Sequence, residues 1–311
     1  MSDNIVPIVS IQCLAYNHEK YIRDCLDGIV SQKTNFRYEA IVHDDASTDG
    51  TQSVIMEYAS KYPDVIKPII EKENLYSNNI GKLRHIMQAN LNGKYIAFCE
   101  CDDYWTDSFK LQKQVDFLES HPDYSMCFHS AQIKYEIESM SWLDCENVKD
   151  RDYSATEIFV HWTVPTASIL CRRDAFALFH NLKGGERILN GDIALILCCM
   201  SKGKVRGFSE KMSVYRVQGK GVTYDEKAKI NRTLKAPSHF ECIRDNFPIV
   251  DHKPLDDTIA KTYFERALVQ NRLVDEIKDF GRSFKNCPKR FFIMLAHMMW
   301  NIIRDVNKNV R

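Results

Sequence analysis

A strand, a polar turn and a helix follow one another twice within about 60 residues, and this repeat constrains the fold more than any other feature. Val6 to Ala15 and Tyr38 to His43 are apolar, β-branched runs typical of buried strands. Each run ends in a polar turn that leads into apolar residues at helical spacing: Tyr21, Ile22, Cys25, Leu26, Ile29 and Val30 first, then Val54, Ile55, Tyr58 and Ala59. Such alternation predicts an α/β fold with a parallel sheet.

Two further runs extend this predicted sheet. Val65 to Ile70 reads as a third, short strand, and Tyr95 to Cys99 is an apolar run of the kind found in fully buried strands. A loop rich in turn residues, 74–81, and a helix over 82–91 lie between them. The first half of the chain therefore predicts a mostly parallel central sheet flanked by helices.

Carboxylates are massed where the fourth predicted strand ends, at Glu100, Asp102 and Asp103. Charged groups at the end of a core strand are costly unless water, a partner or a cation satisfies them. Oxygen ligands of this kind suit Mg²⁺ or Mn²⁺. Ligands also bind at the carboxyl ends of strands in open α/β sheets. A solvated acidic turn that caps the next helix is the alternative.

The turns after the first two strands carry the same kind of signal. Asn17 can cap the following helix or contact a ligand. Ser47 or Asp49 can cap the second helix. The adjacent carboxylates Asp44 and Asp45 exceed what a cap needs, so we expect one of them to accept hydrogen bonds from a ligand. In a parallel sheet these turns and the acidic cluster share one edge, which favours a ligand site over three unrelated turns.

Composition places the chain among soluble globular proteins. Charged residues make up 27% and hydrophobic residues 44% of the chain. Because 42 Lys and Arg balance 42 Asp and Glu, the net charge creates no positive electrostatic field that would favour binding of nucleic acid. The N-terminal residues lack the basic and apolar regions of a signal peptide. The eleven cysteines contain no C-x-x-C pair, so the sequence supports neither a zinc site nor a thioredoxin-like motif. Buried free thiols predict a cytoplasmic protein.

Four segments in order resemble the family 2 glycosyltransferases of the GT-A fold, most closely bacterial enzymes of surface-polysaccharide assembly. They are Val9–His18, His43–Thr51, Gly93–Trp105 and Lys110–Leu118, within roughly the first 130 residues. The resemblance implies a Rossmann-like GT-A sheet and inverting transfer of a sugar from a nucleoside diphosphate, by family habit UDP. The implied acceptor is a glycan or a lipid-linked sugar, in capsular, exo- or lipopolysaccharide synthesis.

The resemblance also implies roles for the strand-end residues. A donor base and ribose would contact Ala15, Tyr16, Asn17, Asp44 and Asp45. Asp103 first, with Asp102 beside it, would hold Mn²⁺ or Mg²⁺ in the DxD motif, which here reads Glu100-Cys101-Asp102. Glutamate at the first place departs from the family, so the role of Glu100 stays open. A divalent ion is needed because the leaving diphosphate gains negative charge.

Basic residues are candidates for contact with the diphosphate. Lys82 and Arg84 stand near the start of a predicted helix, where cations are unfavourable for the helix dipole, although a solvated face explains them as well. Arg216, followed by Gly219, Lys220 and Gly221, resembles the family's strand and flexible loop at the donor site; a plain surface turn is the alternative.

Asp192 is the expected catalytic base. It follows Gly191 and precedes a strongly apolar predicted helix, as the family's base does, although it could be only an N-cap. Inverting transfer needs a carboxylate that takes the proton of the acceptor hydroxyl. The acidic stretch from Tyr135 to Tyr153 could be an acceptor-recognition loop or a plain surface loop.

We expect residues 1–223 to form the catalytic domain and residues 224–311 a helical C-terminal extension. The apolar run from Phe291 to Ile303 is shorter than the roughly 20 residues of a transmembrane helix. Basic residues flank it: Lys285, Lys289, Arg290, Arg304, Lys308 and Arg311. Residues 288–311 therefore predict peripheral contact with the anionic inner face of the plasma membrane. Docking onto the catalytic domain, or onto a second subunit in a homodimer, is the alternative.

Two other functions fit parts of this pattern. A sugar nucleotidyltransferase also places carboxylates around Mg²⁺, but it calls for a glycine-rich phosphate loop after the first strand, and the loop Ala15–Glu19 has no glycine. A sugar-nucleotide-binding partner without catalysis is the other alternative. The presence of both Asp103 and Asp192 counts against it, whereas the change at Glu100 favours it.

Overall fold

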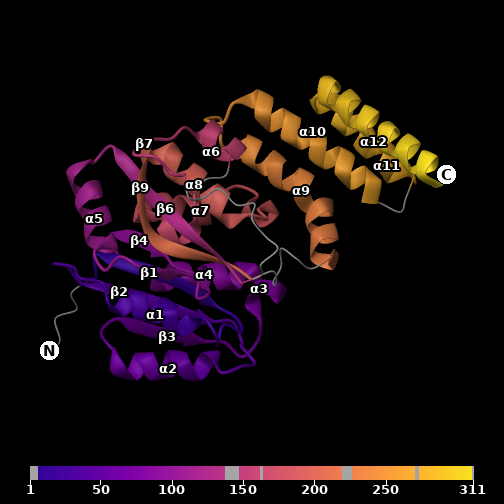
Figure 1. The fold of residues 1–311 in the computed structure, drawn as a ribbon. Helices are drawn as coiled ribbons and strands as arrows, with labels where there is room; N and C mark the ends of the chain where they lie inside the picture. Colours follow the sequence, from indigo (N-terminus) through magenta and orange to yellow (C-terminus); the bar gives the residue numbers. More distant parts are fainter. Residues whose placement is uncertain (1–5, 137–146, 162–163, 219–225, 270–272, 310–311) are drawn as a thin grey trace. The chain divides into compact units, whose positions relative to one another are not determined.

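The computed structural model describes residues 6–136, 147–161, 164–218, 226–269 and 273–309, and it forms an α/β protein with a group of C-terminal helices (Figure 1). The chain divides into two compact units, residues 1–182 with 192–219 and residues 183–191 with 220–311. The boundary expected between residues 223 and 224 lies outside the described residues and stays a prediction.

The first four strands form the parallel sheet that the strand–turn–helix repeat predicts. They are β1 (Val9–Ala15), β2 (Tyr38–Asp44), β3 (Ile66–Ile70) and β4 (Tyr95–Phe98), in the order β3-β2-β1-β4. β1 begins three residues later than the Val6 expected from the sequence, and Val6 is exposed. Pro7 explains the shift, because it has no amide hydrogen to donate to a neighbouring strand.

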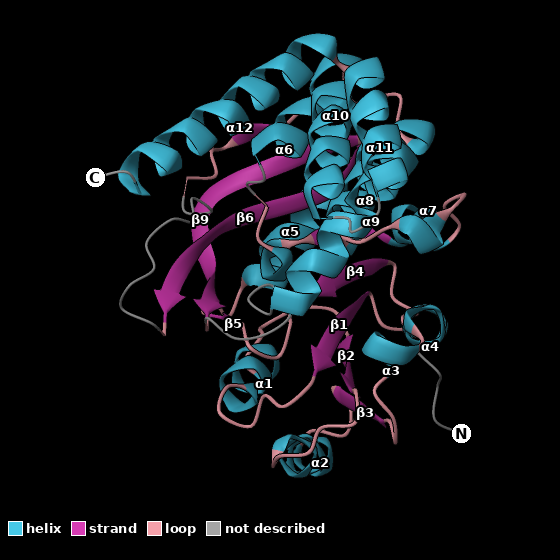
Figure 2. Ribbon diagram, turned by 90° about the vertical axis from the view of Figure 1, so that its right-hand side faces the viewer, coloured by secondary structure: helices cyan, strands magenta, loops and turns pink. Residues whose placement is uncertain are grey.

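The sheet continues with strands that are not all parallel. β8 (Leu170–Arg172) pairs antiparallel with β4 and with β6 (Tyr124–Tyr135), and β6 runs parallel to β9 (Lys204–Val217). Figure 2 shows β6 and β9 as long curved strands side by side. Two-residue strands β5 (Tyr104–Trp105) and β7 (Arg151–Asp152) pair with β9. The pairing of β5 brings the end of β9 back to the acidic turn.

Helices of the first unit cover this sheet with apolar faces. They are α1 (Ile22–Val30), α2 (Thr51–Lys61), α3 (Leu75–Asn78), α4 (Ile80–Asn90), α5 (Lys110–Ser120), α6 (Ala155–His161), α7 (Arg173–His180) and α8 (Gly191–Lys202). α1 buries Ile22, Cys25, Leu26 and Ile29, the face predicted from spacing. Burial of each of the Ile and Leu side chains stabilises the fold by about 1.5–3 kcal/mol. α1 also approaches β5 closely, since a Cβ at Gly28 would lie 2.7 Å from the carbonyl oxygen of Trp105.

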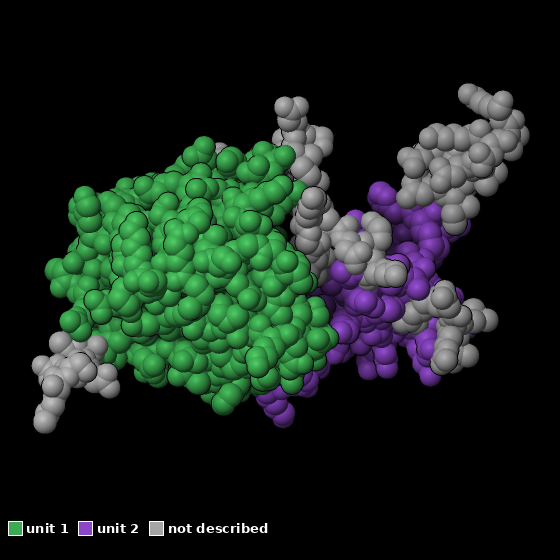
Figure 3. Space-filling view, turned by 90° about the horizontal axis from the view of Figure 1, so that it is seen from below, with its two compact units in different colours: residues 1–182, 192–219 green, residues 183–191, 220–311 purple. Residues whose placement is uncertain are grey.

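The second unit is helical and is shown in its own colour in Figure 3. Its helices are α9 (Glu226–Asn246), α10 (His252–Val269), α11 (Leu273–Asn286) and α12 (Pro288–Asn309). Arg266 on α10 and Asp279 on α11 form a largely buried two-contact ion pair at 2.6 and 2.7 Å, which joins these helices. Among the described residues, no helix is both long and apolar enough to cross a membrane.

Candidate functional site

The turns after β1, β2 and β4 meet at the carboxyl edge of the sheet, as the parallel order requires. Ala15 pairs with Asp44 in register, and the Asp45 amide donates to the Ala15 carbonyl oxygen at 2.9 Å. On the other side of β1, the Cys101 amide donates to the Leu14 carbonyl oxygen at 3.1 Å. Residues far apart in the sequence are therefore brought into one region by backbone hydrogen bonds.

Asn17 ties the first turn to the second. Its backbone is left-handed, with φ of 56°, a conformation that asparagine tolerates better than most residues. Its amide donates to Ser47 Oγ at 2.9 Å, and its side-chain oxygen accepts the Thr48 amide at 2.8 Å. The alternative that Asn17 caps α1 is wrong, because the N-cap of α1 is Tyr21 and makes no side-chain capping bond.

Asp44 and Asp45 are both buried, but the protein uses their oxygens differently. Asp45 accepts the amides of Leu75 at 2.7 Å and of Tyr76 at 2.9 Å, so both its oxygens already have partners. Asp44 accepts the Ser47 amide at 3.0 Å through Oδ1, while its buried Oδ2 has no partner. Asp45 thus positions the loop that carries α3, rather than offering an open acceptor.

Two exposed aromatic side chains lie on turns that hydrogen-bond to Asp45. Tyr16 follows Ala15 and is 46% exposed, and Tyr76 lies in the first turn of α3, held by Asp45, and is 51% exposed. Large exposed rings suit stacking on a flat, polar-edged ligand. Sequence reasoning missed Tyr76, although an aromatic residue inside a turn-rich loop could have indicated it.

The acidic cluster is compact. Glu100, Asp102 and Asp103 can each offer one oxygen such that the three lie within 4.8 Å of one another, the one such group of His, Cys, Asp or Glu found in the described parts of the chain. Asp103 is 1% exposed; its Oδ1 accepts the Arg216 amide at 2.9 Å, and its buried Oδ2 has no partner. Asp102 is half-buried and accepts Gln218 Nε2 at 3.0 Å.

Burial, together with the neighbouring charges, raises the pKa values of Glu100 and Asp103. Burial, followed by the charges of Asp102 and Glu100, raises the pKa of Asp103 well above its usual range. Desolvation, followed by the charges of Asp102 and Asp192, raises the pKa of Glu100 to about 8. Glu100 itself stays accessible to water, so the charges of Asp102 and Asp192 contribute strongly to its raised pKa. A buried orphan oxygen among repelling carboxylates fits a divalent cation, which would satisfy the oxygen and offset the repulsion.

Asp192 lies close enough to this cluster for its charge to act on Glu100. It stands in the first turn of α8, half-buried, and Thr166 Oγ1 approaches its Oδ2 at 3.5 Å. The structure therefore brings together Asp192 and the acidic turn, which are about 90 positions apart in the sequence.

Arg216 supports the acidic turn through hydrogen bonds to Asp102 and Asp103. Its side chain is 2% exposed, donates to the Asp102 carbonyl oxygen at 2.8 Å and pairs with the Asp24 carboxylate. The guanidinium also lies 4.4 Å from the Tyr104 ring centroid, a cation–π arrangement. Both terminal nitrogens of the guanidinium are engaged by Asp102 and Asp24, so Arg216 holds the acidic turn, and its expected contact with phosphate stays a prediction.

The remaining basic candidates contact groups outside the cluster. Lys82 lies 3.7 Å from Glu73, with both side chains exposed. Arg84 is half-buried, 5.5 Å from the Phe179 ring centroid, and burial lowers its pKa. The expected loop of Gly219, Lys220 and Gly221 lies outside the described residues, as does the central part of the acidic stretch, 137–146.

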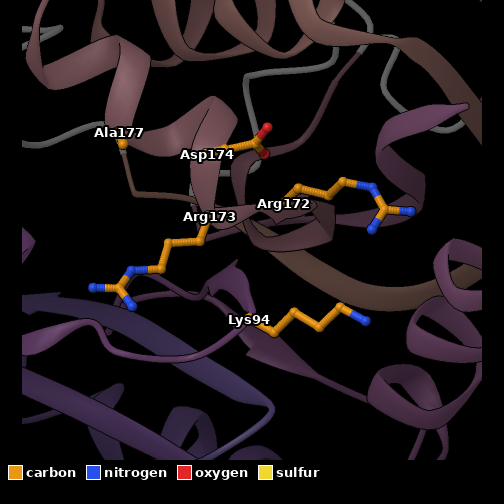
Figure 4. A pocket seen from close by; sticks show the side chains of 5 residues that line it. All are labelled: Lys94, Arg172, Arg173, Asp174 and Ala177. Carbon is orange, nitrogen blue, oxygen red and sulfur yellow. The ribbon is translucent and has the colours of Figure 1, made fainter. Parts of the chain in front are cut away.

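A cavity of about 560 Å³ lies elsewhere, lined by Lys94, Arg172, Arg173, Asp174 and Ala177 (Figure 4). Lys94 precedes β4 whereas the acidic cluster follows it, so this cavity is at the opposite end of that strand. Its cations diverge in Figure 4, and Arg172 already donates to the carbonyl oxygens of Tyr124 and Leu118. The cavity is therefore not part of the predicted site.

Comparison with known proteins identifies the part of the chain that carries the strand-end turns. The family model described as Glycosyl transferase family 2 matches residues 10–179. An uncharacterized protein of Mycobacterium tuberculosis is 33% identical over 235 residues, which cover 72% of this chain and 64% of that protein. The chain thus spans less than two thirds of the length of that relative.

Two further matches concern named proteins. The Escherichia coli enzyme named UDP-Glc:alpha-D-GlcNAc-diphosphoundecaprenol beta-1,3-glucosyltransferase WfaP is 34% identical over 113 residues, 36% of this chain and 42% of that enzyme. The crystal structure of Staphylococcus aureus TarS 1-349 in complex with UDP-GlcNAc superposes with a TM-score of 0.62 at 16% identity, covering 91% of this chain and 82% of that one. The second likeness shows the fold and confirms the expected GT-A architecture.

Proposed function

Because the chain belongs to glycosyl transferase family 2, we propose that it is an inverting enzyme that transfers a sugar from a nucleoside diphosphate to a glycan or lipid-linked acceptor. The observation that carries the proposal is the meeting of the acidic cluster, Asp192 and the aromatic turns at one edge of the sheet. UDP is the favoured nucleotide, since the named WfaP and the TarS complex both involve UDP-sugars.

The donor base fits the turns after β1 and β2. Tyr16 and Tyr76 offer exposed rings for stacking, and Asn17 and Asp45 keep the two turns in place. Asp44 contributes an unpartnered buried oxygen beside them. A nucleoside bound here would meet residues already ordered by hydrogen bonds, so little conformational entropy would be lost on binding.

Asp102 and Asp103 are the proposed holders of Mn²⁺ or Mg²⁺. Asp103 supplies an orphan oxygen, and Asp102 is the more accessible of the two. The ion would stabilise the negative charge that develops on the departing nucleoside diphosphate. Glu100 stands beside them, and a bound cation would favour its charged form.

Asp192 is the proposed general base. An inverting transfer requires a carboxylate that accepts the proton of the acceptor hydroxyl as that oxygen attacks the anomeric carbon. Asp192 comes from a separate element, α8, and its charge reaches Glu100, so the acceptor would enter between α8 and the acidic turn. We place the reaction on the cytoplasmic side of the membrane, in surface-polysaccharide synthesis.

Thermal unfolding with UDP, UDP-sugars and GDP, each with and without Mn²⁺, tests the donor and the metal together. A ligand at 100 times its Kd stabilises the fold by about 2.7 kcal/mol. We expect the largest shift with a UDP-sugar plus Mn²⁺, and its loss in Asp102→Asn and Asp103→Asn but not in the exposed control Asp64→Asn. Equal shifts with and without Mn²⁺ would exclude the metal assignment.

Asp192→Asn separates catalysis from binding. The variant should keep the donor-induced thermal shift and lose sugar transfer, because the amide cannot accept the proton. If transfer persists, the base is another residue. If neither the wild type nor the variant transfers any sugar while both bind a UDP-sugar, the chain is a nucleotide-sugar-binding protein instead.

A further inference from the structure

Helices α11 and α12 expose a continuous apolar surface. On α11, Ile277 is 61% and Phe284 is 44% exposed; on α12, Phe292 is 58%, Ile293 44% and Met299 55% exposed. The Phe284 and Phe292 rings lie 5.7 Å apart, which joins the two helices into one surface. We call these five residues the apolar face. Isolated exposed hydrophobic side chains are common, but a contiguous set marks an interaction surface.

The neighbouring side of α12 is already used for packing. Phe291 lies 5.8 Å from the Phe264 ring on α10 and 6.3 Å from the Phe280 ring on α11. Figure 1 shows α12 running beside these helices. The helix is therefore apolar on two sides, and internal packing explains only one. A helix that is apolar on more than its packed side belongs in an environment that covers the rest.

Charge identifies what covers the apolar face. Residues 273–311, which include both helices of the apolar face, contain eight Lys or Arg residues and four Asp or Glu residues, whereas the whole chain has 42 of each sign. Lys285 and Lys289 are exposed next to the apolar face and form no ion pair with a described carboxylate. A second copy would bring a like-charged segment against this one, which is unfavourable. An anionic surface is complementary.

We propose that the apolar face docks into the headgroup region of an anionic lipid bilayer, with α12 lying in the plane of the membrane. Phe292, Ile293 and Met299 would enter the boundary between headgroups and acyl chains, while Lys285 and Lys289 contact lipid phosphates. Amphipathic helices with basic residues bind membranes in this way, through buried apolar area and attraction to anionic lipids. All of these residues belong to the second unit, and docking does not depend on the transfer reaction.

Co-sedimentation of the full chain with phosphatidylcholine vesicles, with and without phosphatidylglycerol, tests the proposal. We expect binding to the anionic vesicles that weakens as salt is raised. Ile293→Glu and Met299→Glu should each weaken it by about tenfold or more, and Lys285→Gln and Lys289→Gln by about fivefold each. The matched control is Met56→Glu on α2, where the methionine is 52% exposed, and it should bind as the wild type does.

Three results would overturn the proposal. One is wild-type protein that stays in the supernatant with anionic vesicles at low salt. Another is equal loss of binding in Met56→Glu, which would make the effect one of net charge. The third is a dimer in analytical ultracentrifugation that Ile293→Glu turns into a monomer, which would assign the apolar face to a second copy. Met299→Glu guards against misfolding of the Ile293 variant, because Met299 is the more exposed of the two.

Discussion

Replacing Arg216 with methionine tests whether this residue organises the acidic turn or contacts phosphate. The change removes a charge-assisted hydrogen bond to the Asp102 carbonyl oxygen, worth about 1.5–3 kcal/mol. It also removes the contact with the Tyr104 ring, about 0.5–2 kcal/mol. The pair with Asp24 adds at most about 1 kcal/mol, because the Asp24 side chain is 56% exposed. Methionine keeps much of the volume and avoids a buried charge, so the net loss is about 2–4 kcal/mol.

Differential scanning fluorimetry and isothermal titration measure the two consequences. At roughly 2–4 °C per kcal/mol for a unit of this size, the melting temperature of the ligand-free protein should fall by about 5–15 °C. The Mn²⁺-dependent part of UDP affinity should also fall, because the Asp102–Asp103 turn loses its support. UDP affinity without metal should change little.

The matched control is Arg206→Met, which removes an arginine from the same strand at a site remote from the acidic turn. Arg206 donates to the Asp150 carbonyl oxygen at 2.9 Å and lies 3.4 Å from Asp152, but its side chain is 30% exposed. Its loss should cost about 1 kcal/mol or less. An unchanged melting temperature in Arg216→Met, together with loss of metal-free UDP binding, would refute the supporting role and make Arg216 a phosphate contact.

Three further predictions concern stability. Burial lowers the pKa of Lys110 to about 7, below that of an unfolded lysine, so the unfolded state binds more protons than the folded state between these pKa values. The free energy of unfolding should therefore rise by about 1.5 kcal/mol from pH 7 to 8.5. Urea titrations measure this rise, and Lys110→Met should flatten it. Ala46 has a left-handed φ of 63°, so Ala46→Gly should stabilise by about 1 kcal/mol, measured as a higher urea midpoint; a lower midpoint would contradict the strain. Gly28→Ala should lower the melting temperature markedly, since its Cβ would lie 2.7 Å from the Trp105 carbonyl oxygen, and wild-type stability would contradict this close contact.

Local patterns in the sequence predicted most of the first half of the fold. Four apolar runs became parallel strands, and the amphipathic segment after the first run became α1 with its predicted face inward. These features are predictable because burial depends on the spacing of apolar residues along one segment. The antiparallel pairing of β8 and the return of β9 to β5 were not predicted, because register between distant strands depends on the whole sheet.

The sequence alone determined which residue types stand at the strand ends, and hence that a divalent cation was a candidate ligand at Glu100, Asp102 and Asp103; the nucleotide sugar followed from the resemblance to family 2 glycosyltransferases. Only the tertiary structure decided how these groups are used. In the folded protein Asp45 accepts amide hydrogen bonds from the start of α3, and Arg216 donates to the acidic turn. The buried Asp103 Oδ2 has no partner. The physical reason is that a polar side chain buried on folding takes whichever partner the fold brings within hydrogen-bonding distance, and that partner can come from any part of the chain.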